Sequence, residues 1–333
     1  MSEAAAPAVT PKPKKSVALS GVTAGNTALC TVGRTGNDLH YCGYDILDLA
    51  EKCEFEEVAH LLVHGKLPTA AELKAYKTKL QRLRGIPVAV QDVLECIPAS
   101  AHPMDVLRTG CSALGAVLPE GEEHKLAPSR DIADRLMASF GSMLLYWYHF
   151  SHSGRRIEVE TDDDSIGGHF LHLLHGRKPS ELWVRAMHTS LILYAEHEFN
   201  ASTFTARVVA GTNSDMYSAI TAAIGALKGP KHGGANEFAF DTIAIESAAA
   251  AEGALRASPG EAGERFAIGV APAATALDVG LRSTLDRVSS RSEFSAHNRR
   301  ARSFVERLLA VGVAAAVLGD PGPLRRNGDR RAL

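Results

Sequence analysis

The chain has 333 residues, with 36 Lys and Arg against 38 Asp and Glu and a formal net charge of -2. This length is sufficient for one large domain or two ordinary ones with a buried core. A nearly neutral chain has no basic field for nucleic acid or an anionic membrane surface, so we expect neither as a partner. Any anionic substrate must therefore be held by local groups.

Cysteine usage and hydropathy point to one compartment. The five cysteines are odd in number and lack CxxC spacing, which is typical of reduced cysteines in the cytoplasm. No run reaches the roughly 18 apolar residues of a membrane span. Residues 1–15 are rich in Ala, Pro and Lys. The sequence predicts a cytoplasmic protein without a membrane span and with a disordered N-terminus over residues 1–15.

Two short strands are expected at 29–32 and 39–41. Helical patterns dominate the chain after them. Thr69 and Glu72 have capping-box spacing, and Ser165 precedes an apolar run as a helix cap does. The predicted helices lie at 55–64, 69–85, 88–97, 104–117, 131–150, 166–175 and 181–199, followed by a pair within 204–228 that is separated at 211–213. We therefore expect a mostly α, multi-helical large domain over residues 16–240.

Residues 241–333 differ in kind from the preceding chain. They contain no Lys, Tyr, Trp, Cys or Met, and Ala, Gly, Ser and Arg dominate. Two explanations remain open: a disordered or weakly helical segment, or a stretch translated from another reading frame of a GC-rich gene. No small domain is recognisable in this atypical segment.

Two histidines stand in polar settings that suggest chemistry. Residues 194–203 read YAEHEFNAST, in which His197 lies between two glutamates, and residues 229–236 read GPKHGGAN, in which His232 precedes two glycines. A carboxylate neighbour can hold a histidine in one tautomer, and a neutral imidazole beside free backbone N–H groups can stabilise an oxyanion or enolate. The alternatives are a helix histidine with ordinary partners for His197 and a solvent-exposed turn histidine for His232. We expect the preceding helix to carry His197 and a glycine turn to present His232.

Other candidate motifs have weaker support. His169, His172 and His175 are spaced by three, so on a helix they fan apart and cannot easily converge on one metal ion. No phosphate-binding loop motif occurs near Gly225, and Ser142, Ser151 and the cysteines lie in no motif typical of a nucleophilic triad. We predict no metal site and no nucleophilic triad.

The two histidine motifs resemble those of the citrate synthase family. Residues 14–21 (KKSVALSG), 43–46 (GYDI), 64–68 (HGKLP) and 102–106 (HPMDV) are similar to its bacterial 2-methylcitrate synthase branch. The resemblance extends over about residues 14–240. It implies a mostly helical homodimer whose protomers have a large and a small domain, acting on an acyl-CoA and oxaloacetate without a bound cofactor.

The resemblance also implies residue roles. His232 matches the residue that hydrogen-bonds the enolate formed from the CoA thioester, and His197 matches a histidine that binds oxaloacetate. The implied reaction joins propionyl-CoA, oxaloacetate and water into 2-methylcitrate and CoA, as in the methylcitrate cycle of propionate catabolism. Citrate synthesis from acetyl-CoA is the alternative acyl preference. No residue can be assigned to CoA binding.

The resemblance stops before the family's later motifs. The segment Gly-Phe-Gly-His-Pro-Val-Tyr belongs near residue 270, where this chain reads AIGVAP (267–272) without a histidine. In the family, the aspartate base and the arginines that bind oxaloacetate belong to the same missing part. His297 lies outside any matching motif. Cys42 stands where the 2-methylcitrate synthase branch usually has an arginine. We therefore predict that this chain is inactive or nearly so. A non-catalytic helical oligomerisation module or a pseudoenzyme is the alternative of another class.

Overall fold

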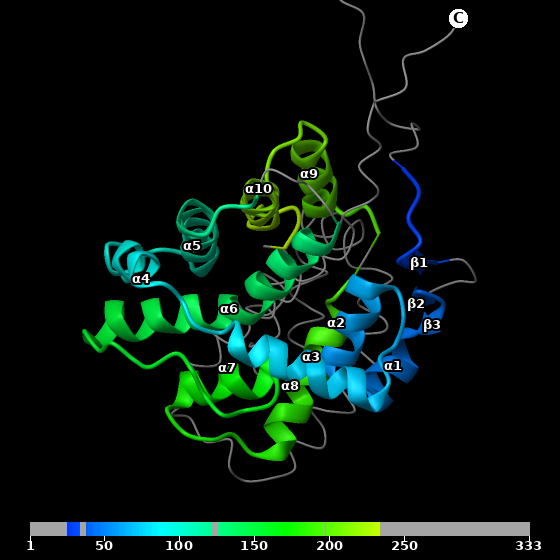
Figure 1. The fold of residues 1–333 in the computed structure, drawn as a ribbon, viewed down its shortest axis with the longest axis horizontal. Coiled ribbons are helices and arrows are strands. Elements are labelled where there is room, and N and C mark those ends of the chain that lie inside the picture. The colour runs from blue at the N-terminus through cyan, green and yellow to red at the C-terminus, as the bar shows by residue number, and fades with distance from the viewer. Residues whose placement is uncertain (1–24, 34–37, 122–125, 197, 234–333) are drawn as a thin grey trace, which may run out of the picture.

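The computed structural model of the protein describes residues 25–33, 38–121, 126–196 and 198–233. The predicted disordered N-terminus (1–15) and the atypical segment 241–333 lie outside these ranges. Within them the chain is mostly α-helical, as the sequence predicts (Figure 1).

A small antiparallel sheet precedes the helices. Its strands β1 (Cys30–Val32), β2 (Leu39–Tyr41) and β3 (Tyr44–Asp45) lie in sequential order, with Tyr41 opposite Tyr44. The two expected strands are confirmed, and β3 is an addition that the sequence did not reveal. Cys42 and Gly43 form the tight turn between β2 and β3, both with positive φ (49° and 91°), which is the geometry of a two-residue hairpin.

Ten helices follow within the described residues. They are α1 (Ile46–Lys52), α2 (Phe55–His64), α3 (Ala70–Arg82), α4 (Val88–Glu95), α5 (Pro103–Val117), α6 (Leu126–Ser153), α7 (Ile166–His175), α8 (Glu181–Leu193), α9 (Ala201–Ala210) and α10 (Met216–Leu227). None of these helices combines the length and apolar character that crossing a bilayer requires.

Side-chain caps explain where several helices begin. The Thr69 and Glu72 capping box is present at α3, with Thr69 Oγ1 accepting the Glu72 N–H and Glu72 accepting the Thr69 N–H. Ser165 accepts the Gly168 N–H at the start of α7, as expected. Each bond satisfies a backbone donor that the first helical turn leaves free.

One helix prediction needs correction. The helix expected over 181–199 ends at Leu193, so residues 194–196 and 198–200 are not helical. Glu198 has φ 54°, a left-handed conformation that a right-handed helix cannot contain. His197, expected on the body of this helix, lies outside the described residues, and the described residues on both sides of it lie outside α8.

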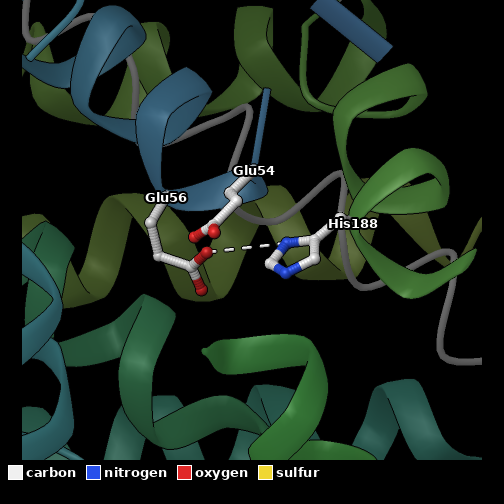
Figure 2. A group of neighbouring side chains, drawn as sticks. All are labelled: Glu54, Glu56 and His188. Carbon is white, nitrogen blue, oxygen red and sulfur yellow. Dashed lines mark ion pairs between the residues drawn. The ribbon is translucent and has the colours of Figure 1, made fainter. Parts of the chain in front are cut away.

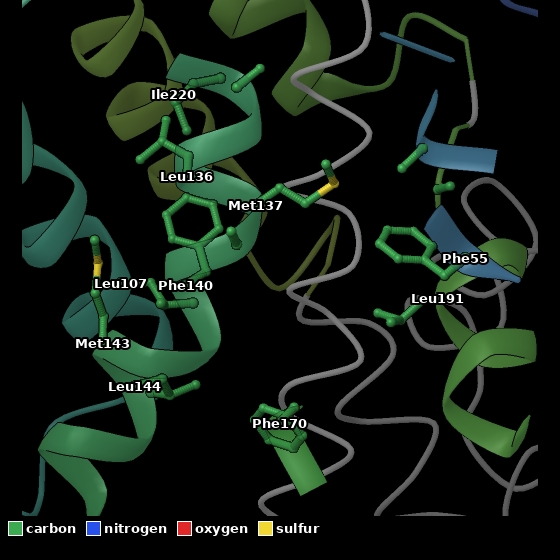
Figure 3. Packing of buried hydrophobic residues seen from close by; sticks show 14 of the residues in the cluster. Phe55, Leu107, Leu136, Met137, Phe140, Met143, Leu144, Phe170, Leu191 and Ile220 are labelled. Carbon is green, nitrogen blue, oxygen red and sulfur yellow. The ribbon is translucent and has the colours of Figure 1, made fainter. Parts of the chain in front are cut away.

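The core is built around α6. This helix has 28 residues and crosses the molecule between α4 and α5 on one side and α7 on the other (Figure 1). Its buried apolar side chains include Leu136, Phe140, Met143 and Leu144, which pack with residues of neighbouring helices (Figure 3). Each Å² of apolar surface removed from water in this core favours folding by roughly 25 cal/mol.

A buried arginine fixes the loop before α7. Arg84 is 1% exposed, and its guanidinium donates to the carbonyl oxygens of Thr161 (3.3 Å), Asp163 (2.5 Å) and Ser165 (2.9 Å). Burial lowers the pKa of Arg84 from its ordinary value. Three carbonyl acceptors compensate for part of that desolvation and tie α3 to the start of α7.

Candidate active site

The helical hairpin of α9 and α10 returns His232 to the beginning of α9. The two helices pack against each other and are joined by a short turn at 211–215, as the Gly211 break predicts (Figure 1). After α10 the Gly229 N–H donates to the Ala226 carbonyl at 3.1 Å, and the His232 N–H donates to the Gly229 carbonyl at 2.9 Å. These two turns reverse the chain, so His232 reaches a serine thirty positions earlier.

Gly233 makes this close return possible. A Cβ atom at this position would lie 2.5 Å from the Leu227 carbonyl oxygen and 2.6 Å from a Leu227 methyl carbon. Only glycine avoids that overlap without displacement of the backbone. The first glycine after His232 is therefore required by the packing of the turn on the end of α10.

His232 contacts Ser202 through one ring nitrogen. Its Nε2 lies 2.8 Å from Ser202 Oγ and 3.3 Å from the Ser202 backbone nitrogen. An amide N–H can only donate, so this contact requires a lone pair on Nε2 and places the ring proton on Nδ1. The Ser202 Oγ lies 2.8 Å from two acceptors, His232 Nε2 and Asn200 Oδ1. Its hydroxyl has a single proton, so the two acceptors share this donor.

The start of α9 also favours a neutral imidazole. Asn200 is the N-cap, and its Oδ1 accepts the Thr203 N–H at 2.9 Å. Ser202 is therefore in the first turn, where the free N–H groups carry partial positive charge. A protonated imidazole is disfavoured there, whereas a neutral ring with Nδ1–H can donate to a developing negative oxygen.

His197 itself lies outside the described residues, but its neighbours are placed. Glu196 is buried, and its N–H donates to the Tyr41 hydroxyl at 3.2 Å. The Val32 N–H donates to Glu198 Oε1 at 3.3 Å. The expected pairing of a glutamate with His197 stays a prediction. The structure shows instead that both flanking glutamates contact the small sheet through backbone or side chain.

Sequence reasoning missed Ser202 as a partner of His232. Asn200, Ser202 and Thr203 stood out only as polar residues after His197. An Asn that directly precedes a helical run is a common N-cap, and this signal could have placed Ser202 in a first turn with its N–H available. What the sequence could not reveal is that the α10 turn brings His232 to that position.

The three histidines of α7 do not converge, as the spacing argument predicts. His169 contacts Ser142 Oγ and Thr161 Oγ1, each at 3.0 Å, and His172 Nδ1 lies 2.6 Å from Asp163 Oδ2. His175 faces the Trp183 ring edge to face at 6.1 Å. Each histidine therefore has its own partners in the described part of the chain.

Ser142 does have a base nearby, although not in sequence. Both Ser142 and His169 are buried in the core, and burial lowers the pKa of His169 to about 3. Ser142 Oγ also donates to the Val159 carbonyl at 3.4 Å. This pair is internal to the protein, so it stabilises the contact between α6 and α7 and offers no nucleophile to a substrate.

A second cluster of chemical groups joins α2 and α8. Figure 2 shows Glu54 and Glu56, from the N-terminal end of α2, facing His188 of α8, with Glu56 Oε2 3.6 Å from His188 Nδ1. Such a set could ligate a cation, but the Phe55 N–H donates to Nδ1 at 2.9 Å and so uses the lone pair that a metal needs. The Lys77 ammonium already lies 2.5 Å from Glu54 Oε2. We interpret the cluster as a structural junction.

Burial shifts the pKa values of Glu56 and His188 in opposite directions, and both shifts favour the neutral form of the side chain. Burial raises the pKa of Glu56 to about 7, and burial lowers the pKa of His188 to about 4. Glu56 is 0% exposed, its Oε1 accepts the Ile166 N–H at 2.7 Å, and its Oε2 has no hydrogen-bond partner. A carboxylic acid beside a neutral imidazole avoids two buried charges.

Comparison with known families agrees with this arrangement. Residues 18–264 match the family model described as citrate synthase, C-terminal domain. The chain therefore belongs to the citrate synthase family. Among curated relatives, the 2-methylcitrate synthase of Shewanella oneidensis is 62% identical over 225 residues, which cover 68% of this chain and 59% of that relative. The 2-methylcitrate synthase of Mycobacterium tuberculosis is 42% identical over 255 residues, covering 76% of this chain and 64% of that relative.

Solved structures share the fold. The citrate synthase of Thermotoga maritima has a TM-score of 0.69 and 29% identity, with coverage of 90% of this chain and 88% of that chain. The Thermoplasma acidophilum citrate synthase, in a ternary complex with carboxymethyl coenzyme A and oxaloacetate, has a TM-score of 0.69 and 26% identity, with 90% of each chain covered. The chain nevertheless spans less than two thirds of the length of the two curated relatives described above.

Proposed function

We propose that the chain carries part of a site for 2-methylcitrate synthesis, in which propionyl-CoA, oxaloacetate and water give 2-methylcitrate and CoA. The observation that carries this proposal is the contact between His232 and Ser202, which leaves a neutral imidazole with its proton on Nδ1. The 62% identity to the Shewanella 2-methylcitrate synthase favours propionyl-CoA over acetyl-CoA.

The proposed role of His232 follows from the chemistry of a thioester. Its α-proton is weakly acidic, so a carboxylate base can remove it only if a preorganised donor stabilises the enolate as it forms. His232 is the proposed donor and His197 a proposed contact of oxaloacetate. No bound cofactor and no metal take part in this proposal; the CoA thioester is a substrate.

We propose further that this chain turns over slowly or not at all. No histidine occurs in residues 267–272, and the expected aspartate and arginine motifs are not recognisable in 241–333. Oxaloacetate is a dianion, and each missing charge-assisted hydrogen bond would weaken its binding by roughly 1.5–3 kcal/mol. We therefore propose that the chain holds half of a condensing site and catalyses the reaction little or not at all. The proposed compartment is the cytoplasm.

A CoA-release assay tests the reaction. Propionyl-CoA or acetyl-CoA is mixed with oxaloacetate and the chain, and a full-length family member serves as the reference. Turnover near the reference would contradict the low activity, and a preference for acetyl-CoA would favour citrate synthesis instead. Thermal stabilisation by millimolar oxaloacetate without turnover, lost in His197→Ala and kept in the exposed control His152→Gln, indicates a pseudoenzyme. Neither turnover nor stabilisation would favour an oligomerisation module.

Self-association is the proposed quaternary state. Phe204 and Val208 lie one turn apart on α9 and are 43% and 54% exposed, which gives this helix an apolar outer face in the monomer. Sedimentation at tens of micromolar should show a homodimer that Phe204→Asp weakens. The control Leu182→Asp changes an exposed leucine on α8. A wild-type monomer at that concentration contradicts the proposal.

A further inference from the structure

The small sheet holds the segment 194–200 on both sides of position 197. On one side, the Tyr41 hydroxyl of β2 accepts the Glu196 N–H at 3.2 Å and donates to the Ile192 carbonyl at 3.0 Å. On the other side, the β1 residue Val32 donates its N–H to Glu198 Oε1 at 3.3 Å. These contacts join residues more than 150 positions apart.

Tyr41 is suited to this task by its burial. Its side chain is 0% exposed, and burial raises the pKa of its phenol above the ordinary value, so the hydroxyl keeps its proton. A buried hydroxyl is costly without partners, and this one uses its donor on Ile192 and an acceptor position on Glu196. The tight turn at Cys42 and Gly43 fixes the end of β2 and therefore the root of this side chain.

The described residues of this segment, 194–196 and 198–200, lie outside any helix or strand, so contacts with other parts of the chain must hold them. It begins where α8 ends, and Glu198 adopts φ 54°, which costs of the order of 1 kcal/mol for a residue with a side chain. Phe199 packs against Gly25, where a Cβ would lie 3.0 Å from the Phe199 ring, and the Arg207 guanidinium stacks on the same ring at 4.9 Å. Residues on both sides of position 197 are thus held by other parts of the chain.

We propose that Tyr41 is a positioning residue for the His197 part of the site. Its hydroxyl bridges the end of α8 to the N–H of Glu196 and so fixes the backbone immediately before His197. This role rests on the proposed function, in which His197 contacts oxaloacetate. His232 is positioned separately by Ser202, so Tyr41 acts on the oxaloacetate side and not on the thioester side.

Tyr41→Phe removes the bridge and keeps the ring that fills the core. The matched control is Tyr44→Phe, which removes a hydroxyl from an exposed residue in the same sheet. In the full chain, hydrogen exchange of the Glu196 amide should accelerate roughly two- to tenfold in Tyr41→Phe, the range expected from one net hydrogen bond. The control should match the wild type. Unchanged exchange at Glu196 in Tyr41→Phe overturns the proposal.

A second measurement separates positioning from general stability. The affinities for oxaloacetate and for propionyl-CoA are measured by titration calorimetry at millimolar ligand. Tyr41→Phe should weaken oxaloacetate binding by about threefold to tenfold and leave propionyl-CoA binding unchanged. An equal loss for both ligands, or no loss for oxaloacetate, refutes the positioning role. A wild-type chain that binds no oxaloacetate contradicts the proposed function itself, and the exchange measurement then decides whether Tyr41 holds the segment.

Discussion

Glu56→Gln tests the buried junction between α2, α7 and α8. Glutamine has nearly the same shape as a protonated glutamate, so its oxygen can still accept the Ile166 N–H. The variant therefore imitates the neutral acid at every pH. It should fold like the wild type under mildly acidic conditions and differ from it only where Glu56 becomes charged.

The magnitude follows from proton linkage. The pKa of Glu56 rises from 4.5 to about 7 on folding, so its contribution to stability is full below pH 4.5 and is lost as pH rises through about 7. A difference of this size corresponds to about 3 kcal/mol of unfolding free energy. The variant lacks this loss. Its stability relative to wild type should therefore increase by about 3 kcal/mol between acidic and mildly alkaline pH.

Urea unfolding at about pH 5, 6, 7 and 8 measures this difference. The depressed pKa of His188 contributes stability that is present above pH 6.5 and is lost as pH falls through about 4. That contribution is common to both proteins and cancels in the comparison. Glu51→Gln, on the exposed surface of α1, controls for the loss of one carboxylate. A stability difference that stays constant from pH 5 to 8 would refute a neutral Glu56.

Two further substitutions test the packing that positions the site. Arg84→Met leaves three carbonyl oxygens without their buried donor and should lower the unfolding free energy by roughly 3 kcal/mol, with the exposed Arg82→Met as control. Little change in urea unfolding would contradict that role. Gly233→Ala places a Cβ 2.5 Å from the Leu227 carbonyl and should destabilise by about 1–3 kcal/mol. It should also alter the ¹⁵N chemical shifts that report the His232 ring tautomer. The control Gly121→Ala, with open space around its Cβ position, should leave these shifts unchanged. Unchanged shifts in Gly233→Ala would show that the turn tolerates a side chain.

The local patterns of the sequence were sufficient for most of the helices. The α2 helix ends before Gly65 and α7 begins after Ser165 as predicted, because apolar periodicity and caps are properties of neighbouring residues. The helix expected over 181–199 was too long because the YAEHEFNAST motif retains apolar residues at helical spacing while Glu198 adopts a left-handed backbone. The printed partner of the Glu198 side chain is the Val32 N–H of β1, 166 positions earlier in the sequence.

What the sequence alone determined is the helical class and the family resemblance, since these depend on composition, periodicity and short motifs. What only the tertiary structure decided is which groups meet. The contacts of Ser202 with His232 and of Tyr41 with Glu196 join positions 30 and 155 residues apart. The burial that raises the pKa of Glu56 is likewise created by three helices together. Hydrogen-bond partners and desolvation depend on distances through space, and spacing along the chain does not encode them directly.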